Sequence, residues 1–358
     1  MTDLPQGATI GILGGWQLGR MLSVAASRLG YPCHIYEPGA APAGDVARQV
    51  TTAAYTDEAA LRAFAASVDV ITYEFENVPA SALDLLESLK PIRPNRRALA
   101  ISQDRIDEKS FLNDLGLQTA PWAAVGSEAA LRAAAGRLGL PAILKTTRLG
   151  YDGKGQLRLD RDTDLAAAWA AMNDSPCVLE GFIAFEREVS VIAARSLDVS
   201  VACYDPGENV HRYGILRSTT VPAHLSPAQR SDAILIAARI LNALDYVGVM
   251  GVELFVTATG LLVNEIAPRV HNSGHWTQAG CAVDQFEQHI RAVAGLPLGD
   301  GHRHADVVME NLIGDDVLRL PDLLRSRDTA VHLYGKGAPR PGRKMGHVNR
   351  ILRRERGA

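Results

Sequence analysis

Short apolar segments alternate with longer Ala/Leu-rich stretches over the first hundred residues of the chain. We expect strands at residues 8–13, 32–36 and 70–72, and helices at residues 17–29 and 58–67. This alternation is typical of βαβ units, so it predicts an open parallel sheet in an N-terminal α/β domain over residues 1–105. Ligands of such sheets bind beyond the carboxyl ends of the strands, where Gly14, Gly15, Glu37 and residues 74–77 are expected to meet.

The pattern becomes mixed after residue 105. Helices are expected at residues 106–115, before Leu138 and at residues 231–244, and strands at residues 142–145, 177–183 and 188–194. We therefore predict an α+β domain over residues 106–300, with a lid subdomain at about 116–185. Pro and Gly become more frequent after residue 300, which indicates a small β-rich domain over residues 301–358.

Length, composition and charge narrow the class of protein. The chain has 358 residues, of which 47% are hydrophobic, and a formal net charge of −3. Two or three globular domains fit this length, and so weak a charge gives no field suited to a nucleic-acid backbone. The 4 cysteines are far apart, which argues against a zinc site or a redox dithiol. No signal-peptide pattern or membrane-length apolar run is present, so we expect a cytoplasmic protein without a membrane partner.

A glycine-rich turn follows the first expected strand. Residues 10–19 resemble the strand-turn-helix fingerprint of dinucleotide-binding folds, in which a central glycine leaves room for a pyrophosphate. Trp16 occupies that central position, where its indole would obstruct a pyrophosphate. A nicotinamide cofactor is therefore disfavoured, although Glu37 lies at a sequence position suited to ribose contact. A tight turn and a phosphate site both remain open.

The most informative segment is Lys145-Thr-Thr-Arg-Leu-Gly-Tyr-Asp-Gly-Lys-Gly-Gln156. An expected strand ends in a cation and is followed by three glycines that are interleaved with Asp152 and Lys154. Backbone amides in such a loop can surround phosphates. The spacing differs from that of the nucleotide loop ending in Gly-Lys-Ser/Thr, so that fold is disfavoured, and a flexible hairpin is the alternative.

Carboxylates lie around the strand expected at residues 177–183. Glu180 precedes Gly181, and Glu188 follows the strand. A purine can pair with such a strand while Glu188 binds the ribose hydroxyls. Taken alone, however, the pattern favours a solvated edge strand that is protected by its charges.

A β-hairpin is predicted over residues 251–266, with its turn at residues 257–260. Counting outward from Thr259 places Glu253 and Glu265 directly opposite each other, a pairing that costs free energy between like charges. Two carboxylates that share Mg²⁺ with nucleotide phosphates would relieve that cost, and Asn264 offers another oxygen. A surface hairpin with unpaired acids is the alternative.

Two polar segments follow the hairpin. Residues 267–276 are dense in Arg, His, Asn and Ser, but Gly274 and the missing Glu argue against a helical zinc pair of His271 and His275. From Lys336 to the end, eight Lys/Arg residues face one acidic residue. This basic segment can receive a substrate phosphate, but taken alone the pattern favours a solvated tail.

Five segments in this order resemble the 5-(carboxyamino)imidazole ribonucleotide synthase family of purine enzymes along nearly the whole chain. They are Leu13-Gly-Gly-Trp-Gln-Leu-Gly-Arg-Met21, Thr72-Tyr-Glu-Phe-Glu-Asn-Val-Pro79, Gly150-Tyr-Asp-Gly-Lys-Gly-Gln156, Asn264-Glu-Ile-Ala-Pro-Arg269 and His271-Asn-Ser-Gly-His-Trp-Thr277. The resemblance implies an ATP-grasp fold with an N-terminal Rossmann-like domain and a small C-terminal domain. It also implies a magnesium-dependent ligase that acts in the cytoplasm as a homodimer.

The resemblance assigns ligands to individual residues. ATP would contact Arg105, Lys145, Gly150, Tyr151, Asp152, Gly153, Lys154, Gly155, Gln156, Glu180, Gly181, Phe182, Ile183, Glu188, His211, Asn264 and Glu265, and Mg²⁺ would be bound by Glu253 and Glu265. Aminoimidazole ribonucleotide would contact Gln17, Leu18, Glu76, Tyr151, Asp152, Arg269, His271 and Asn272, with its phosphate on Lys344 and Arg350. Lys154, Asp152 and Arg269 would act in catalysis. One departure stands out, because the family usually has glycine where this chain has Trp16.

The implied reaction begins with bicarbonate attacking the γ-phosphate of ATP to give carboxyphosphate, and the substrate amine then captures the carboxyl carbon, directly or as released carbon dioxide. The loop around residues 152–155 is expected to close over ATP and exclude water. A formate-using ATP-grasp transferase, a nicotinamide-dependent oxidoreductase and a non-catalytic nucleotide sensor are the alternatives. Labelled bicarbonate, nicotinamide binding and turnover, respectively, distinguish them.

Overall fold

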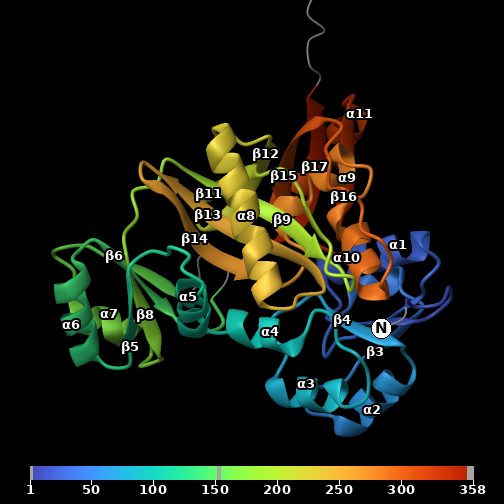
Figure 1. Cartoon of the computed structure of the whole chain (residues 1–358), viewed down its shortest axis with the longest axis horizontal. Helices are drawn as coiled ribbons and strands as arrows, with labels where there is room; N and C mark the ends of the chain where they lie inside the picture. Colours follow the sequence, from blue (N-terminus) through green and yellow to red (C-terminus); the bar gives the residue numbers. More distant parts are fainter. Residues whose placement is uncertain (1–2, 151–154, 353–358) are drawn as a thin grey trace, which may run out of the picture.

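The computed structural model describes residues 3–150 and 155–352. Within these residues the strands form three sheets: two with four strands and one with nine. Figure 1 shows the nine-stranded sheet in the middle of the molecule, with one small sheet on the N-terminal side and the other at the opposite end. We call the nine-stranded sheet the central sheet.

The N-terminal sheet is parallel, as predicted. Its strands are β1 (Ile10–Leu13), β2 (Cys33–Tyr36), β3 (Gln49–Thr51) and β4 (Val70–Tyr73), in the order β3-β2-β1-β4. Helices α1 (Gln17–Arg28), α2 (Glu58–Ala66), α3 (Ala80–Glu87) and α4 (Arg96–Ser102) connect and cover these strands. Every residue of β1, β2 and β4 is buried, which explains why these runs are mostly apolar, with His34 and Thr72 as buried polar exceptions.

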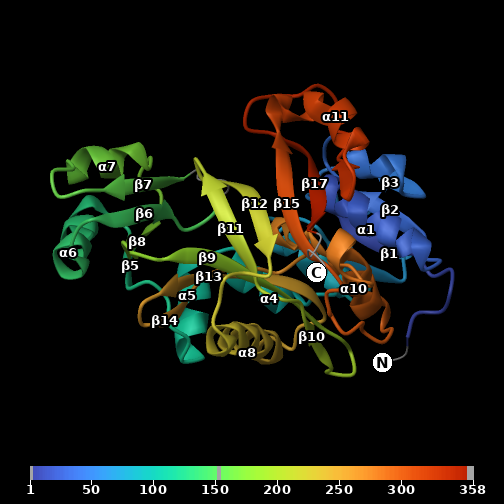
Figure 2. The same ribbon diagram turned by 90° about the horizontal axis from the view of Figure 1, so that it is seen from above.

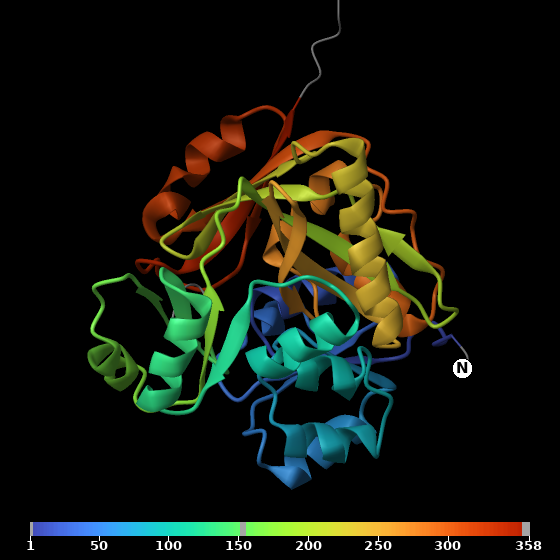
Figure 3. The same ribbon diagram turned by 60° about the vertical axis from the view of Figure 1, so that its left-hand side comes forward.

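The lid is a separate four-stranded sheet with its own helices. It consists of β5 (Trp122–Val125), α6 (Glu128–Leu138), β6 (Ala142–Thr146), β7 (Gln156–Leu159), α7 (Leu165–Ala171) and β8 (Cys177–Gly181). Leu131, Leu144 and Trp169 belong to a core that contains residues of the lid only. Figure 3 shows α5 (Arg105–Asp114) beside α4, between the lid and the N-terminal domain.

The position of β8 corrects the sequence interpretation. Taken alone, the pattern around Glu180 favoured a solvated edge strand, but β8 pairs with β5 on one side and β6 on the other. Glu180 is 4% exposed. The sequence pattern could not reveal this, because the cations that compensate the buried charge come from other elements.

The central sheet has the order β14-β13-β9-β11-β12-β15-β17-β16, with β10 paired to β9. Its strands are β9 (Arg187–Arg195), β10 (Val201–Cys203), β11 (Gly207–Arg212), β12 (Ile215–Val221), β13 (Gly248–Thr257), β14 (Gly260–Ala267), β15 (Asp306–Ile313), β16 (Thr329–Leu333) and β17 (Lys344–Leu352). Strand β15 pairs with β12 along Val307–Glu310, so the C-terminal strands continue this sheet. Figure 2 shows β15 and β17 beside the β11–β12 hairpin. The C-terminal region is thus β-rich and continuous with the preceding sheet.

Helix α8 (Pro227–Ala243) covers one face of the central sheet (Figure 1). It begins with a capping box in which Ser226 accepts from the Gln229 amide and the Gln229 side chain accepts from the Ser226 amide. Its buried Ala237 and Ile240 pack in a core shared with β9 and β13. At 17 residues α8 is the longest described helix, and no helix of residues 3–150 and 155–352 is long and apolar enough to cross a membrane.

A shared core holds the N-terminal domain against the rest of the chain. Helix α1 packs on α10 (Gln285–Ala294), and a single buried cluster contains Ile12 and Leu22 together with Trp276 and Met309. The carboxyl ends of β1 and β4 are therefore fixed beside the segment that follows β14.

Candidate active site

A cavity of about 950 Å³ lies where the three parts of the molecule meet. Twenty of the predicted site residues line it: Gln17, Leu18, Glu76, Arg105, Lys145, Gly150, Gln156, Glu180, Gly181, Phe182, Ile183, Glu188, His211, Glu253, Asn264, Glu265, Arg269, His271, Asn272 and Lys344. They come from the N-terminal domain, α5, the lid, strands β9, β11, β13, β14 and β17 of the central sheet, and the segment after β14. One cavity therefore gathers almost all the residues that the sequence singled out.

The remaining predicted site residues fall into two groups. Tyr151, Asp152, Gly153 and Lys154 lie outside the described residues. Gly155 and Arg350 are described but do not line the cavity. Gly155 has φ +69°, and a Cβ there would come within 2.7 Å of the Thr146 hydroxyl, so this position requires glycine. The Arg350 Nη1 atom binds the Glu310 Oε2 atom at 2.7 Å, and the structure does not bring this guanidinium to the cavity.

Two lysines bind the buried Glu180 carboxylate at the lid side of the cavity. The Lys145 Nζ atom lies 2.9 Å from Glu180 Oε2, and the Lys109 Nζ atom lies 3.1 Å from Glu180 Oε1. Burial raises the pKa of Glu180, but the two ammonium groups outweigh burial and hold the pKa below its ordinary value. The charged carboxylate thus fixes Lys145, which also faces the cavity.

An apolar wall lies next to this ionic group. The rings of Phe185 and Phe255 stack with centroids 4.7 Å apart and an interplanar angle of 9°, and both line the cavity together with Phe182. Glu188 pairs with the His211 Nδ1 atom on the neighbouring strand. Burial lowers the pKa of His211, but the bonded Glu188 carboxylate outweighs burial and raises it. A flat apolar wall beside fixed polar groups suits a purine nucleotide.

Glu253 and Glu265 are direct cross-strand partners in the β13–β14 hairpin, which confirms the predicted opposition. The turn spans Thr257 to Gly260, also as predicted, but the ladder shifts by one residue after Leu254. This β-bulge leaves Asn264 as an extra residue, so Asn264 and Glu265 together oppose Glu253. The opposition therefore depends on the bulge as well as on the turn.

The acidic pair lacks full compensation from the described cations. Burial, and then the Glu265 carboxylate, raise the pKa of Glu253 to about 7. Burial also raises the pKa of Glu265, but Arg105, 3.3 Å away, and Lys145 outweigh it and lower that pKa. In residues 3–150 and 155–352 no group of three or more His, Cys, Asp or Glu side chains is arranged to hold a metal. Two carboxylates are nevertheless the donor set that suits Mg²⁺ when phosphate oxygens complete its shell.

Two carboxylates accept hydrogen bonds from the backbone amides of the N-terminal glycine turn. Glu37 accepts from the Gly15 amide at 2.9 Å, and Glu74 accepts from the Trp16 amide and from the Gly19 amide at 2.6 Å. Burial raises the pKa of Glu74 to about 7 despite these two amide donors. The structure therefore favours the tight turn over a pyrophosphate site. The Glu37 carboxylate stabilises this glycine turn because it accepts from the Gly15 amide.

The Trp16 indole lies in the cavity wall beside cations of the C-terminal region. The Lys336 Nζ atom is 5.8 Å and the Arg343 guanidinium carbon 5.5 Å from the indole centroid. Lys336 also lies 5.5 Å from the Tyr334 ring. All of these residues line the cavity with Lys344, so this end of the cavity is cationic.

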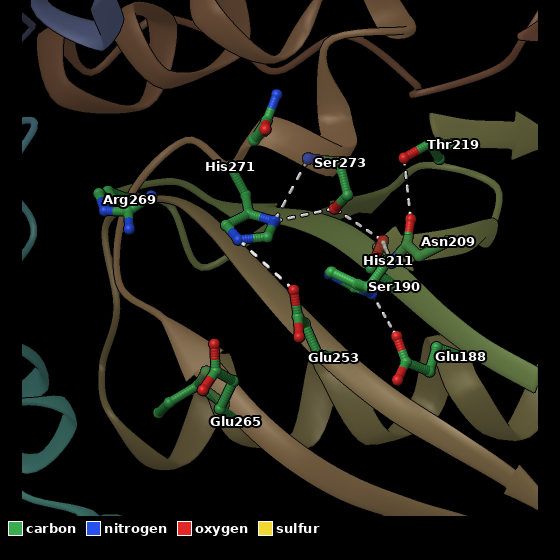
Figure 4. Close-up of polar contacts among 12 residues, drawn as sticks. Glu188, Ser190, Asn209, His211, Thr219, Glu253, Glu265, Arg269, His271 and Ser273 are labelled. Carbon is green, nitrogen blue, oxygen red and sulfur yellow. Dashed lines mark hydrogen bonds and ion pairs between the residues drawn. The ribbon is translucent and has the colours of Figure 1, made fainter. Parts of the chain in front are cut away.

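The segment after β14 faces the acidic pair (Figure 4). Arg269 forms an ion pair with Glu76, with Nη2 3.0 Å from Oε1. The His271 Nε2 atom lies 3.6 Å from Glu253 Oε1, and burial together with Arg269 lowers the pKa of His271 to about 3. Asn272 exchanges hydrogen bonds with the Asn311 side chain. The fully buried His275 accepts from Gln285.

The sequence interpretation missed several residues of the site. Lys109 is buried against Glu180, and Glu108 accepts from the Ile266 amide at 2.7 Å. Both lie on α5 with Arg105, at spacings of three and four residues, so one face of this helix supports the site. The charged residues on one face of α5 were a sequence signal that could have identified Glu108 and Lys109. Lys336 begins the basic segment that the sequence singled out, but Phe185, Phe255 and Tyr334 gave no distinctive pattern.

Comparison with known proteins gives the same picture. Residues 110–286 match the family model of the ATP-grasp domain, residues 7–103 that of the ribonucleotide synthetase preATP-grasp domain, and residues 307–356 that of the phosphoribosylaminoimidazole carboxylase C-terminal domain. The chain is 57% identical over 354 residues to an N5-carboxyaminoimidazole ribonucleotide synthase of Brucella melitensis, covering 98% of each chain.

Solved structures are similar over almost the whole length. One is an ADP complex of an N5-carboxyaminoimidazole ribonucleotide synthetase, with a TM-score of 0.95 and 40% identity over 98% of this chain and 94% of that one. Another is the Aspergillus clavatus synthase with ADP and 5-aminoimidazole ribonucleotide, with a TM-score of 0.91 and 32% identity over 97% and 94%. The predicted ATP-grasp fold, with its N-terminal and C-terminal domains, is confirmed.

Proposed function

This chain belongs to the N5-carboxyaminoimidazole ribonucleotide synthase family, and on that premise we propose how its cavity performs the family's reaction. The chain is an ATP-dependent ligase that carboxylates the amino group of 5-aminoimidazole ribonucleotide with bicarbonate, in purine biosynthesis. One observation carries the assignment to this site. A single cavity is lined both by Lys145 and the acidic pair, which suit a nucleotide, and by Arg269, His271 and residues of the N-terminal domain.

ATP occupies the side of the cavity formed by the lid and the hairpins. The purine lies against Phe185 and Phe255, the ribose hydroxyls are bound by Glu188, and the phosphates by Lys145 and Arg105. Glu180 supports this arrangement because it fixes the Lys145 ammonium group. Tyr151, Asp152, Gly153 and Lys154 remain predicted contacts.

Mg²⁺ is held by Glu253 and Glu265. The two carboxylates are opposite each other and only partly exposed, and burial together with the Glu265 carboxylate raises the pKa of Glu253, which a bound cation would offset. When bound, the ion supplies a Lewis acid that offsets charge on the transferring phosphoryl group.

The substrate occupies the end of the cavity that is lined by the N-terminal domain. Its phosphate is bound by Lys344, with Lys336 and Arg343 nearby, while Arg269, Asn272 and the Gln17–Leu18 segment hold the remainder. Arg269 is fixed by Glu76 and so presents a rigid cation to bicarbonate or to the substrate. Arg350 is not included in this assignment because it pairs with Glu310.

The reaction proceeds in two steps. A bicarbonate oxygen forms a bond to the γ-phosphorus of ATP as the bond to the β-phosphate oxygen breaks, which yields carboxyphosphate and ADP. The substrate amine then forms a bond to the carboxyl carbon, phosphate leaves, and the nitrogen loses a proton. The cations Lys145, Arg105 and Arg269 offset the charge that builds up in both steps.

The test measures ADP release and incorporation of isotope from labelled bicarbonate. We expect both to require 5-aminoimidazole ribonucleotide, bicarbonate and Mg²⁺ together. Glu265→Gln should lower kcat at least about 100-fold, because Lewis-acid stabilisation is worth several kcal/mol. Glu58→Gln, on the exposed side of α2, is the matched control and should retain wild-type activity.

Two outcomes would contradict this assignment. Isotope incorporation from formate in place of bicarbonate would indicate a different ligase. Unchanged turnover in Glu265→Gln would remove the acidic pair from metal binding.

Three further features belong to the same proposal. We propose that the domains span residues 1–105, 106–300 and 301–358, with the lid at about 116–185. We also propose that the enzyme works in the cytoplasm, because its substrates are small soluble metabolites, and that it assembles as a homodimer. Size-exclusion chromatography with light scattering tests the dimer.

A further inference from the structure

A continuous chain of buried side-chain hydrogen bonds leads from the central sheet to His271 (Figure 4). The Thr219 hydroxyl donates to Asn209 Oδ1 at 2.8 Å, and the Asn209 amide donates to Ser190 Oγ at 3.1 Å. The Ser190 hydroxyl donates to Ser273 Oγ at 2.7 Å, and Ser273 Oγ lies 2.8 Å from His271 Nδ1. The chain thus connects β12, β11, β9 and the segment after β14.

These links are shielded from water. Thr219 and Ser273 are 0% exposed, Ser190 2% and Asn209 6%. A buried polar group without a partner costs about 1–3 kcal/mol, and here each group is satisfied by the next. Such a network is costly to interrupt, so it gives its terminal residue a defined orientation.

The direction of the hydrogen bonds at His271 follows from a backbone contact. The Ser273 amide N–H lies 3.4 Å from His271 Nδ1 and can only donate. Nδ1 is therefore the acceptor, and the Ser273 hydroxyl also donates to it. In the neutral ring the proton then resides on Nε2, which faces Glu253 Oε1 at 3.6 Å.

We propose that Thr219, Asn209, Ser190 and Ser273 are positioning residues that hold His271 as an Nε2–H hydrogen-bond donor toward an anionic oxygen at the reacting end of the cavity. His271 therefore acts as a fixed dipole beside the acidic pair, and its Nε2 atom does not serve as a proton acceptor. This inference rests on the proposed function for the identity of the reactants, but not for the state of the imidazole ring.

The energetic consequence is preorganisation. A donor held in place before the reaction needs no reorientation as charge builds up on an oxygen. Without this hydrogen-bond network, the His271 imidazole can change its tautomer or rotate, and the Nε2–H donor is lost for part of the time. We expect the effect on kcat, because the described residues proposed to bind ATP do not form side-chain hydrogen bonds with this hydrogen-bond network.

The experiment combines kinetics with nitrogen NMR of the full-length enzyme. Thr219→Val removes the first donor at nearly constant volume and lies outside the cavity wall. We expect kcat to fall about fivefold, as for the loss of one buried hydrogen bond, with KM for ATP unchanged. Thr219→Ser restores the hydroxyl and should restore kcat. Thr220→Val, on the partly exposed face of the same strand, is the matched control.

Long-range proton–nitrogen spectra of histidine-labelled enzyme report the tautomer, and His271→Gln assigns the signal. We expect His271 to carry its proton on Nε2 in the wild type and to show a mixture of tautomers in Thr219→Val. Ser190→Ala provides a second interruption of the chain if Thr219→Val does not fold.

The outcomes separate this inference from the assignment of function. A proton on Nδ1 in the wild type would overturn the inference even if carboxylation is confirmed. So would folded Thr219→Val and Ser190→Ala enzymes that keep wild-type kcat and the wild-type His271 signal. Absence of carboxylation with the expected Nε2–H signal would overturn the proposed function and leave the positioning of His271 intact.

Discussion

Trp16 occupies the position of the glycine turn at which the resemblance led us to expect a glycine. Its φ of −93° lies in an ordinary region, so a side chain is tolerated without backbone strain. The indole turns toward the cavity, where Lys336 and Arg343 approach its ring. The tryptophan thus joins the N-terminal turn to the loop between β16 and β17.

Replacement of this tryptophan should weaken substrate binding selectively. In Trp16→Gly the two cations lose a contact worth about 0.5–2 kcal/mol each, so we expect KM for 5-aminoimidazole ribonucleotide to rise roughly tenfold. KM for ATP should stay within about twofold, because Phe185 and Phe255 are at the other end of the cavity. Steady-state kinetics with each substrate varied in turn measures both values. Equal changes in the two KM values would contradict this role.

At the scale of elements, the β-bulge of the β13–β14 hairpin places both Asn264 and Glu265 opposite Glu253. Without an extra residue, side chains alternate between the two faces of a strand, and only one of the two residues could oppose Glu253. The bulge therefore gathers three oxygen-bearing side chains at one point of a regular hairpin.

Deletion of Asn264 tests whether the bulge has this role. The deletion restores a regular ladder, whereas Asn264→Ala removes the side chain and keeps the bulge. We expect the Mg²⁺ concentration for half-maximal ATPase activity to rise about tenfold in the deletion and less in Asn264→Ala, because Glu265 stays opposite Glu253 in both variants but only the deletion removes the local bend and twist that aim its carboxylate. Titration of Mg²⁺ at saturating ATP measures this. Identical Mg²⁺ curves for the two variants would show that the bulge does not aim Glu265.

At the scale of the whole molecule, a buried histidine joins the N-terminal and central sheets. The His289 Nδ1 atom accepts from the Val249 amide at 3.1 Å, so its Nε2 atom donates to the Thr72 hydroxyl at 2.8 Å. Burial lowers the pKa of His289 to about 3. The bridge between the sheets therefore requires a neutral ring.

The stability of the enzyme should fall as the pH is lowered. The unfolded chain binds a proton at His289 below about pH 6.5, whereas the folded chain binds it only near pH 3. The contribution of His289 to the free energy of unfolding is therefore fully present above pH 6.5 and declines between these two pH values by about 1.4 kcal/mol per pH unit. His289→Gln should be less stable at pH 7.5 but less sensitive to acid. Urea unfolding at pH 7.5, 6.5 and 5.5 measures the difference. Parallel pH profiles for the two proteins would contradict this account.

The sequence alone determined those features that depend on neighbouring residues. Apolar runs predicted the parallel N-terminal sheet, because a strand buried on both faces is mostly apolar. The hairpin over residues 251–266 followed from its turn and placed the acidic pair correctly, although the bulge that completes the opposition was not foreseen. The resemblance of the glycine-rich and polar segments to a known family selected 20 residues that line one cavity.

Only the tertiary structure decided which distant residues compensate one another. Lys109 and Lys145 meet at Glu180, Arg350 pairs with Glu310 away from the cavity, and Ser190 connects Asn209 to Ser273. These contacts join elements that are far apart in sequence. Local periodicity specifies which face of an element is buried but not which element will cover it, and the free energy of a buried charge or hydroxyl depends on that partner.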